Sequence, residues 1–543
     1  MLDDTQIPDQ AGLRPLTETD RLQRAAAMNC VDPAKKPGVA DCSQLLWISL
    51  FFDGTGNNLD DDTPRLKHSN VARLYLTHAQ DDDSTGRYRI YIPGLGTPFR
   101  EIHDTSRNPL GGAFGAGGER RLQWARAKFD QIIAKAKARA TNPKHEIRMI
   151  NVALFGFSRG AACARAFAVR LAAECKQQSE GWQWSGLPIR LYFMGLFDTV
   201  ASAGLPAGAK ALEHSPAVRF RATAINPFAA VTLTVAPKNG HYEWGKHLKI
   251  PMMVEQCVHY VAAHEVRDSF PLDSVRDGKQ YPPNTVEVVY PGVHSDVGGG
   301  YAPGEQAKAL QDNEKLSQIP LLHMHRSAYA AGVPLRAIGR LQDDVRAYFD
   351  LSPKTVHLFD SYQSKAQAGG PLEQAFSDHL YQLYCARSYL AKVTHDEAAQ
   401  ARIPAARQIL TQTGNTDQVS KLSKEVARIT ENGLAVNEAM EAAAYRKRDG
   451  KTLNLREATL ARAEVDVSLT VAVSLSAESD AERQVSLNFF DYLVHDSVAG
   501  FGADLSKLEN WRMMYFGDLA YEPENNWSLT DASDLTEKVQ TSA

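Results

Sequence analysis

The pentamer Gly156-Phe157-Ser158-Arg159-Gly160 constrains the fold more than any other part of the chain. An apolar, partly β-branched run precedes it over residues 148–155, and an alanine-rich run typical of a helix follows it. A strand that passes into a helix with no room for a loop predicts a sharp turn that projects the Ser158 hydroxyl. The glycines are then needed because a Cβ would collide with the neighbouring strand or helix. We expect Ser158 to be a nucleophile; the alternative is a tight turn whose serine only caps the helix.

Strands and helices alternate from about residue 45 to residue 301. Helices are predicted over 69–78, over 119–140 and over 254–270, the last carrying His259 and His264. Apolar runs of strand length, each followed by a turn rich in glycine or aspartate, occupy residues 45–52, 88–92, 148–155, 189–196 and 286–290. The alternation predicts an α/β fold, an α/β-hydrolase-like, doubly wound and mostly parallel sheet with an inserted helical module.

The character of the sequence changes on both sides of this region. Residues 1–44 are mostly polar and are predicted to form an N-terminal arm. Residues 45–349 are predicted to form the α/β-hydrolase catalytic domain. Long, polar-faced helices are predicted in 350–485, a helical module in which a β-branched run at 465–473 fits either a strand or a helix. Aromatic, core-like sequence returns in 486–543, so we expect this C-terminal segment to pack back on the catalytic domain.

Composition excludes several classes of function. A formal charge of −4 and the absence of a Lys/Arg block give no electrostatic basis for binding nucleic acid. The N-terminus lacks a basic and then apolar stretch, which predicts synthesis in the cytoplasm without a classical signal peptide. The six cysteines include no Cys-x-x-Cys pair, so we expect free thiols, no metal site and no cofactor.

A serine nucleophile needs a base and a carboxylate that orients the base. Asp198 and His294 each stand just after a predicted strand, and the order Ser158, Asp198, His294 is that of α/β-hydrolases. The glycine-rich flank of His294 suggests a mobile, exposed imidazole. His495 is the alternative base, whereas Asp296 is too close to His294 in sequence and is expected to brace its loop.

The oxyanion hole is predicted from two segments. The N–H of Arg159, at the start of the helix after the serine, would supply one donor, and the turn containing Gly54 and Thr55 would supply the other. Two alternatives stay open for this turn, which begins at Asp53. It could serve only to stabilise the sheet, or it could be an acidic loop that binds phosphate or metal.

Five motifs in this order resemble a known family: residues 51–58, 91–97, 156–160, 196–200 and 291–301. They resemble the first class of type VI secretion lipase effectors, and residues 494–501 are similar to the C-terminal segment of that family. The resemblance implies a phospholipase A that acts on bacterial membrane phospholipids as an antibacterial toxin, with Ser158 as nucleophile, Asp198 as orienting acid and His294 as base.

The resemblance also implies partners and a destination. It implies docking on a type VI spike protein, delivery into the target cell and there into the periplasm, and a cognate immunity protein. A lipase needs an apolar rim near its serine, and the apolar run within 201–250 is our candidate lid, although a buried core segment explains that run equally well. Its substrate-binding candidates are Ile225, Phe228, Val231 and Leu233. A serine esterase acting on a soluble ester and a non-catalytic docking protein with a hydrolase fold are the alternative functions.

Overall fold

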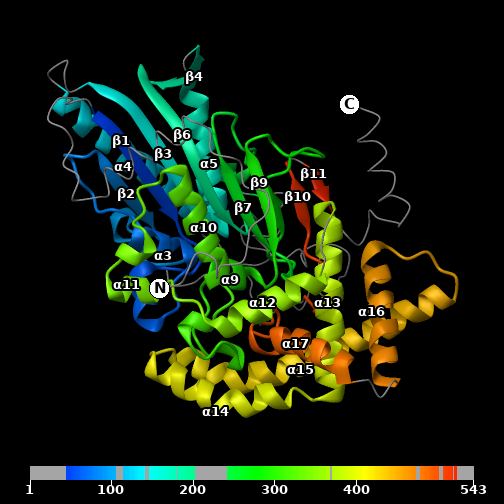
Figure 1. Ribbon diagram of the computed structural model, residues 1–543. Helices are drawn as coiled ribbons and strands as arrows, with labels where there is room; N and C mark the ends of the chain where they lie inside the picture. The colour runs from blue at the N-terminus through cyan, green and yellow to red at the C-terminus, as the bar shows by residue number, and fades with distance from the viewer. Residues whose placement is uncertain are drawn as a thin grey trace.

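The fold is taken from a computed structural model (Figure 1). The structure describes residues 44–105, 114–140, 146–179, 181–201, 241, 243–366, 370–472, 477–500, 506–517 and 519–521. Almost all of the predicted N-terminal arm and the whole predicted lid run therefore lie outside the described residues.

A mostly parallel sheet forms the centre of the molecule (Figure 1). Its parallel strands lie in the order β2, β1, β3, β6, β7, β9, and β4 and β5 add an antiparallel hairpin beside the first part of β6. The strands are β1 (Gln44–Phe52), β2 (Arg87–Ile92), β3 (Ile147–Phe157), β4 (Cys175–Gln178), β5 (Gly181–Trp184), β6 (Leu187–Phe197), β7 (Cys257–Ala262) and β9 (Thr285–Tyr290). The mixed α/β architecture and the predicted central strands are confirmed.

Helices cover both faces of this sheet, as β1 shows. Leu46, Ile48 and Leu50 point into a core shared with α4 (Phe114–Arg139) and α5 (Arg159–Glu174). Trp47 and Phe51 point to the opposite face, into a core shared with α3 (Asn70–Thr77) and α10 (Gln318–Ala331). A strand with apolar side chains on both faces can be buried only in the middle of such a sandwich, where each large side chain contributes roughly 1.5–3 kcal/mol by burial.

The remaining elements are a small second sheet and further α-helices. A small second sheet joins β8 (Leu272–Ser274) to β10 (Met514–Phe516) and β11 (Leu519–Tyr521), and β10 runs parallel to β8. Residues near the C-terminus thus pair with a segment between β7 and β9. The other α-helices among the described residues are α2 (Leu59–Asp62), α9 (His294–Gly298), α11 (Asp343–Ala347), α12 (Pro353–Ala366), α13 (Leu372–Val393), α14 (Glu397–Gln412), α15 (Thr416–Arg448), α16 (Leu455–Ala472) and α17 (Ala477–Tyr492).

The helix predicted over 254–270 is wrong. Residues 257–262 form β7, which pairs with β6 on one side and β9 on the other, and turns follow it. His259 lies on this strand, fully buried, with Nδ1 2.8 Å from Glu287 Oε1, and His264 lies beyond its end. A short apolar run is compatible with either a helix or a strand. Here it forms a strand because it pairs with β6 on one side and with β9 on the other. The ambiguous run at 465–473 belongs to α16 up to residue 472.

Two further expectations concern the described residues alone. The four cysteines among them are free thiols, as predicted: Cys163, Cys175, Cys257 and Cys385. None of the helices that the structure describes combines the length and the apolar character needed to cross a bilayer.

A buried polar chain connects the helices to the carboxyl edge of the sheet. The Gly292 N–H donates to His264 Nδ1 at 2.9 Å, and this assigns the ring proton of His264 to Nε2, 3.2 Å from the Tyr362 hydroxyl. The Tyr362 hydroxyl then donates to His379 Nδ1 at 2.6 Å. His379 must therefore accept, which a doubly protonated ring cannot do. Burial lowers its pKa from 6.5 to about 4.

We expect this neutral histidine to make folding sensitive to acid. The unfolded chain binds a proton at His379 below about pH 6.5, whereas the folded chain does so only near pH 4, so stability falls as the pH drops between these values. In a His379→Gln variant, the loss of unfolding free energy from about pH 7.5 to 5, measured by urea denaturation, should be smaller than in the wild type by about 2 kcal/mol. The exposed His357 on α12 provides the control: His357→Gln should keep the wild-type pH dependence.

Candidate active site

Ser158 stands alone between β3 and α5, in a backbone conformation that L-residues rarely adopt. Its φ is 58° and its ψ is −127°, and its side chain makes no capping hydrogen bond to the helix. The alternative of a serine that only caps α5 is therefore wrong. A strained serine between a central strand and a helix has the backbone geometry of a nucleophile elbow, and Ser158 is buried, only 2% exposed.

The glycines of the pentamer are needed for packing, as predicted. A Cβ on Gly156 would lie 2.4 Å from the Cα of Ala161 in α5. A Cβ on Gly160 would lie 2.3 Å from the carbonyl oxygen of Asp53, at the end of the neighbouring strand β1. Neither position can hold a side chain unless the helix moves away from the sheet, so the glycines fix how closely α5 approaches the strand ends.

Asp198 lies immediately after β6, beside the serine turn. The Ser158 N–H donates to the carbonyl of Phe197 at 3.0 Å, which joins the two strand ends directly. Asp198 has a φ of 38° and is completely buried. Its N–H donates to the Tyr260 carbonyl at 2.7 Å, and its Oδ1 accepts the Ala262 N–H at 2.9 Å. Bonds to the neighbouring strand β7 therefore hold both backbone and carboxylate.

His294 is the first residue of α9, and the structure brings it to Asp198. Its Nδ1 donates to Asp198 Oδ2 at 2.6 Å. The imidazole packs between two aromatic rings, with centroid distances of 4.6 Å to Phe157 and 4.9 Å to Phe270. Because Phe157 directly precedes the serine, this packing places the imidazole next to the elbow. The ring is buried, only 4% exposed, so the expected exposed imidazole is wrong: aromatic packing outweighs the freedom of the glycine flank.

Electrostatics favour an ionised aspartate and a neutral histidine. Burial opposes ionisation of Asp198, but the charge of Arg512 and the hydrogen bonds from Arg512 and His294 outweigh it and hold the pKa of the carboxyl well below its usual range. For His294, burial lowers the pKa below 6.5, and the neighbouring carboxylates of Asp198 and Glu265 offset only part of this effect. The imidazole is thus free to accept a proton at neutral pH.

The turn after β1 is held by a buried carboxylate. Asp53 accepts the Gly54 N–H at 2.7 Å and the hydroxyls of Ser69 and Tyr91. Burial raises the pKa of Asp53 to about 6, against the effect of these hydrogen bonds. The Gly54 N–H is thereby occupied, whereas the Thr55 N–H has no hydrogen-bond partner within the described residues. The predicted oxyanion donors thus reduce to Thr55 and Arg159, the first residue of α5.

The competing candidates have other partners. Asp296 accepts the Val293 N–H and also binds His495, whose Nδ1 lies 2.7 Å from its Oδ1. Asp296 therefore braces the loop, as expected. The Nε2 of His495 is buried and has no hydrogen-bond partner in the described structure, and its ring stacks on Tyr301. The lid candidates Ile225, Phe228, Val231 and Leu233 lie outside the described residues.

Three residues of the site gave no recognisable signal in the sequence. Arg512 binds the carboxylate of Asp198 from the C-terminal part of the chain, 314 residues further on. Glu265 accepts the N–H of His294 at 3.3 Å, and Phe270 forms one wall around the imidazole. None of the three stands in a motif, and Glu265 and Phe270 fall in the segment wrongly predicted as a helix.

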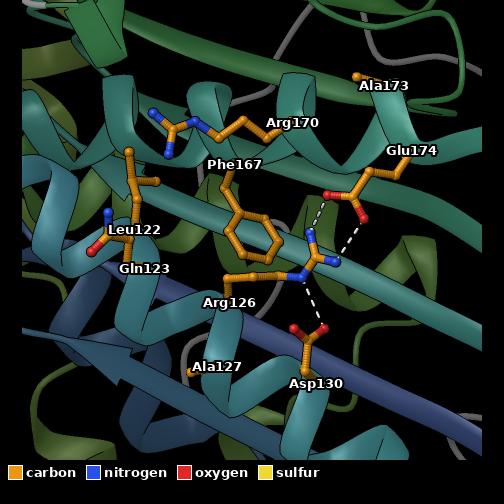
Figure 2. Close-up of a pocket in the computed structure, with 9 residues that line it drawn as sticks. All are labelled: Leu122, Gln123, Arg126, Ala127, Asp130, Phe167, Arg170, Ala173 and Glu174. Carbon is orange, nitrogen blue, oxygen red and sulfur yellow. Dashed lines mark hydrogen bonds and ion pairs between the residues drawn. The ribbon is translucent and has the colours of Figure 1, made fainter.

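A pocket of about 560 Å³ lies elsewhere, between α4 and α5 (Figure 2). Phe167 forms part of its wall, and Arg126 beside it is held by Glu174 and Asp130 (Figure 2). None of the predicted site residues lines this pocket. Among the described residues, no three His, Cys, Asp or Glu side chains converge as metal ligands would, and Asp53 binds the hydroxyls of Ser69, before α3, and Tyr91, on β2.

Comparisons with known proteins place the chain in a family. The family model described as "T6SS, Phospholipase effector Tle1-like, catalytic domain" matches residues 47–175 and 171–327. Among solved structures, an uncharacterized protein from Pseudomonas aeruginosa is similar in fold, with a TM-score of 0.67 and 22% identity over 94% of this chain and 84% of that chain. A second, the Tle1 effector bound to the VgrG spike from the Type 6 secretion system, gives a TM-score of 0.38 and 17% identity over 64% of this chain and 87% of that chain.

No curated protein matches the chain significantly. The family match extends over just over half of the 543 residues and includes Ser158, Asp198 and His294. It confirms the resemblance seen in the five motifs, and the chain belongs to the Tle1-like phospholipase effector family of type VI secretion.

Proposed function

We propose that this protein is a phospholipase A-type serine hydrolase that cleaves acyl esters of bacterial membrane phospholipids and acts as an antibacterial effector. The observation that carries the proposal is the buried pair of Asp198 and His294 beside the strained turn of Ser158. Family membership supports the lipid substrate. The mostly parallel sheet supports the mechanism, because all three side chains follow its strands at one edge.

In the acylation step, His294 Nε2 takes the proton of the Ser158 hydroxyl as the oxygen attacks the ester carbonyl of the lipid. Asp198 holds Nδ1–H, which fixes the tautomer that leaves Nε2 free to accept, and stabilises the imidazolium. The N–H groups of Thr55 and Arg159 are the proposed donors to the oxyanion, each worth about 3–4 kcal/mol in comparable enzymes. The lysophospholipid then leaves with the proton from His294.

Deacylation repeats the same proton transfers with water. His294 takes a proton from water, the resulting hydroxide attacks the acyl-serine, and the fatty acid leaves as Ser158 regains its proton. All proton transfers in this cycle run through one imidazole. The aromatic rings of Phe157 and Phe270 exclude water from most of its surface, which keeps the imidazole in its neutral form.

The biological part of the proposal concerns delivery. We propose synthesis in the cytoplasm, docking on a type VI spike protein, action in the periplasm of the target cell, and neutralisation in the producing cell by an immunity protein. Family membership supports secretion by this system. The spike and immunity proteins require tests of their own.

The first test removes the nucleophile. Ser158→Ala should lower fatty-acid release from vesicles of phosphatidylethanolamine and phosphatidylglycerol by about three orders of magnitude or more, because no other hydroxyl stands at the elbow. Lipids labelled separately at the two acyl positions identify the bond that is cleaved. Thermal unfolding should be close to that of the wild type, since the hydroxyl makes no capping bond.

The alternative functions give different results in the same assay. A serine esterase for soluble esters would hydrolyse a short-chain p-nitrophenyl ester through Ser158 and leave the vesicles intact. A docking protein would hydrolyse neither substrate, and full vesicle activity in Ser158→Ala would contradict the proposed mechanism.

The second test addresses the oxyanion turn. Asp53→Asn replaces a carboxylate that accepts three hydrogen bonds with an amide that has one acceptor oxygen, so the turn before Thr55 should lose its fixed position. We expect kcat to fall by about tenfold or more, with a smaller change in KM. Asp61→Asn, at an exposed position of α2, the helix that follows this turn, is the matched control and should leave kcat unchanged. An equal effect of both substitutions would argue against a role for the turn.

The third test concerns the compartment. Expression in a Gram-negative host with an export signal added should lyse or arrest the cells, whereas expression in the cytoplasm should be tolerated, with viable counts as the readout. Exported Ser158→Ala should be harmless at equal protein levels. Equal toxicity from both compartments would contradict action from the periplasm.

A further inference from the structure

Besides the Ala262 N–H, the carboxylate of Asp198 has two side-chain partners, His294 and Arg512, and only His294 was expected. His294 Nδ1 donates to Oδ2 at 2.6 Å. The guanidinium of Arg512 donates to the same Oδ2 at 2.8 Å through Nη1 and to Oδ1 at 2.7 Å through Nη2. This forked geometry fixes the plane of the carboxylate as well as its position. Arg512, together with the Ala262 N–H, therefore sets the direction in which the Asp198 carboxylate faces His294.

The contact between Arg512 and Asp198 is an interior contact. Arg512 is 1% exposed and Asp198 is 0% exposed, so neither charge is screened by water. Arg512 Nη2 also donates to the carbonyl of Ala262, at the end of β7, at 2.9 Å. The guanidinium lies 5.4 Å from the ring centroid of Phe376 on α13. A buried ion pair of this kind leaves an uncompensated charge when one partner is removed, which is strongly unfavourable.

Neighbouring contacts tie Arg512 to the sheet. It lies two residues before the start of β10, which pairs with β8, and the indole N–H of Trp511 donates to the Tyr384 hydroxyl at 3.0 Å. Further back, the N–H of His495 donates to Asp296 on α9, the helix that begins with His294. The C-terminal part of the chain thus contacts both the loop of the acid and the helix of the base.

The charged groups around His294 are balanced in pairs. Asp198 and Glu265 are the carboxylates that bond to His294, and each binds an arginine through both oxygens: Arg512 for Asp198 and Arg267 for Glu265. On α9 itself, Asp296 is occupied by His495 and by the Val293 N–H. In the described structure, each of these carboxylates beside the imidazole therefore has a counter-charge or hydrogen-bond donors of its own.

We propose that Arg512 is a positioning residue of the catalytic site, which orients the Asp198 carboxylate toward His294 and balances its charge so that the imidazole stays neutral and able to act as the base. This inference rests on the proposed serine hydrolase mechanism. It makes the docked C-terminal segment a part of the active site. Without Arg512, the full negative charge of Asp198 would stabilise the imidazolium and raise the pKa of His294.

The experiment separates this role from a purely structural one. Arg512→Met removes the charge, Arg512→Lys keeps it without the fork, and Arg346→Met removes an exposed arginine as the control. The readout is kcat and KM for a soluble p-nitrophenyl butyrate substrate across about pH 5 to 9, with fluorophosphonate labelling of Ser158 in parallel. A merely structural arginine would change the amount of folded enzyme and would leave the pH profile of the folded fraction in place.

For Arg512→Met we expect the acid limb of kcat to move up by about one pH unit, and kcat on the plateau to fall at least about tenfold with KM within about twofold. For Arg512→Lys we expect the same loss of kcat with a limb within about half a unit of the wild type. Arg346→Met should match the wild type. Folded Arg512 variants with wild-type kcat and a wild-type limb would overturn the proposal.

The test also holds if a variant does not fold. If Arg512→Met fails to fold, wild-type kcat in Arg512→Lys overturns the proposal and a tenfold loss supports it. If neither variant folds, Arg512 is required for the fold itself, and the proposal of a separate positioning role is overturned. Wild-type enzyme that fluorophosphonate does not label at Ser158 would instead refute the proposed function, so the two failures are distinguishable.

Discussion

The buried carboxylate of Asp198 is the interaction on which the rest of the site depends. A completely buried charge is tolerated only when hydrogen bonds and a counter-charge replace its hydration, and Asp198 receives the Ala262 N–H, the imidazole of His294 and the fork of Arg512. Each donor comes from a different segment of the chain. Ionisation of one side chain therefore requires that β6, β7, α9 and the C-terminal segment are all in place.

The parallel sheet explains why these segments meet. The ends of β1, β3, β6 and β9 lie at one edge, and each delivers one functional group: the Asp53 turn, Ser158, Asp198 and His294. Glycines set how closely the parts approach. A Cβ on Gly54 would lie 2.5 Å from the Phe157 ring, and one on Gly298 would lie 1.9 Å from it. Phe157 is thereby held between the turn after β1 and the end of α9, and its ring packs against the imidazole of His294.

The sequence was informative where the signal is local. Period, strand length and turn residues located the central strands and placed Ser158, Asp198 and His294 at strand ends, because each of these features is encoded within about ten neighbouring residues. The prediction of a helix over 254–270 failed because the deciding contacts are not local. β7 is a strand because β6 and β9 pair with it on its two sides, and neither strand lies within the sequence window around His259. Arg512 is a partner of Asp198 only through a contact across 314 residues, and a lone arginine among aromatic residues has no pattern.

Two carboxylates at the same edge of the sheet have pKa values shifted in opposite directions, and the difference indicates their roles. Asp53 is surrounded by neutral donors, the hydroxyls of Ser69 and Tyr91 and one N–H, and burial raises its pKa to about 6. Asp198 also binds the guanidinium of Arg512, whose charge holds the pKa of this carboxyl well below its usual range. The carboxylate of Asp53 holds its turn in place through the three hydrogen bonds that it accepts from neutral groups. Only a carboxylate with a fixed charge can orient an imidazole and stabilise its protonated form, so the cation beside Asp198 is what makes this edge of the sheet suitable for proton transfer.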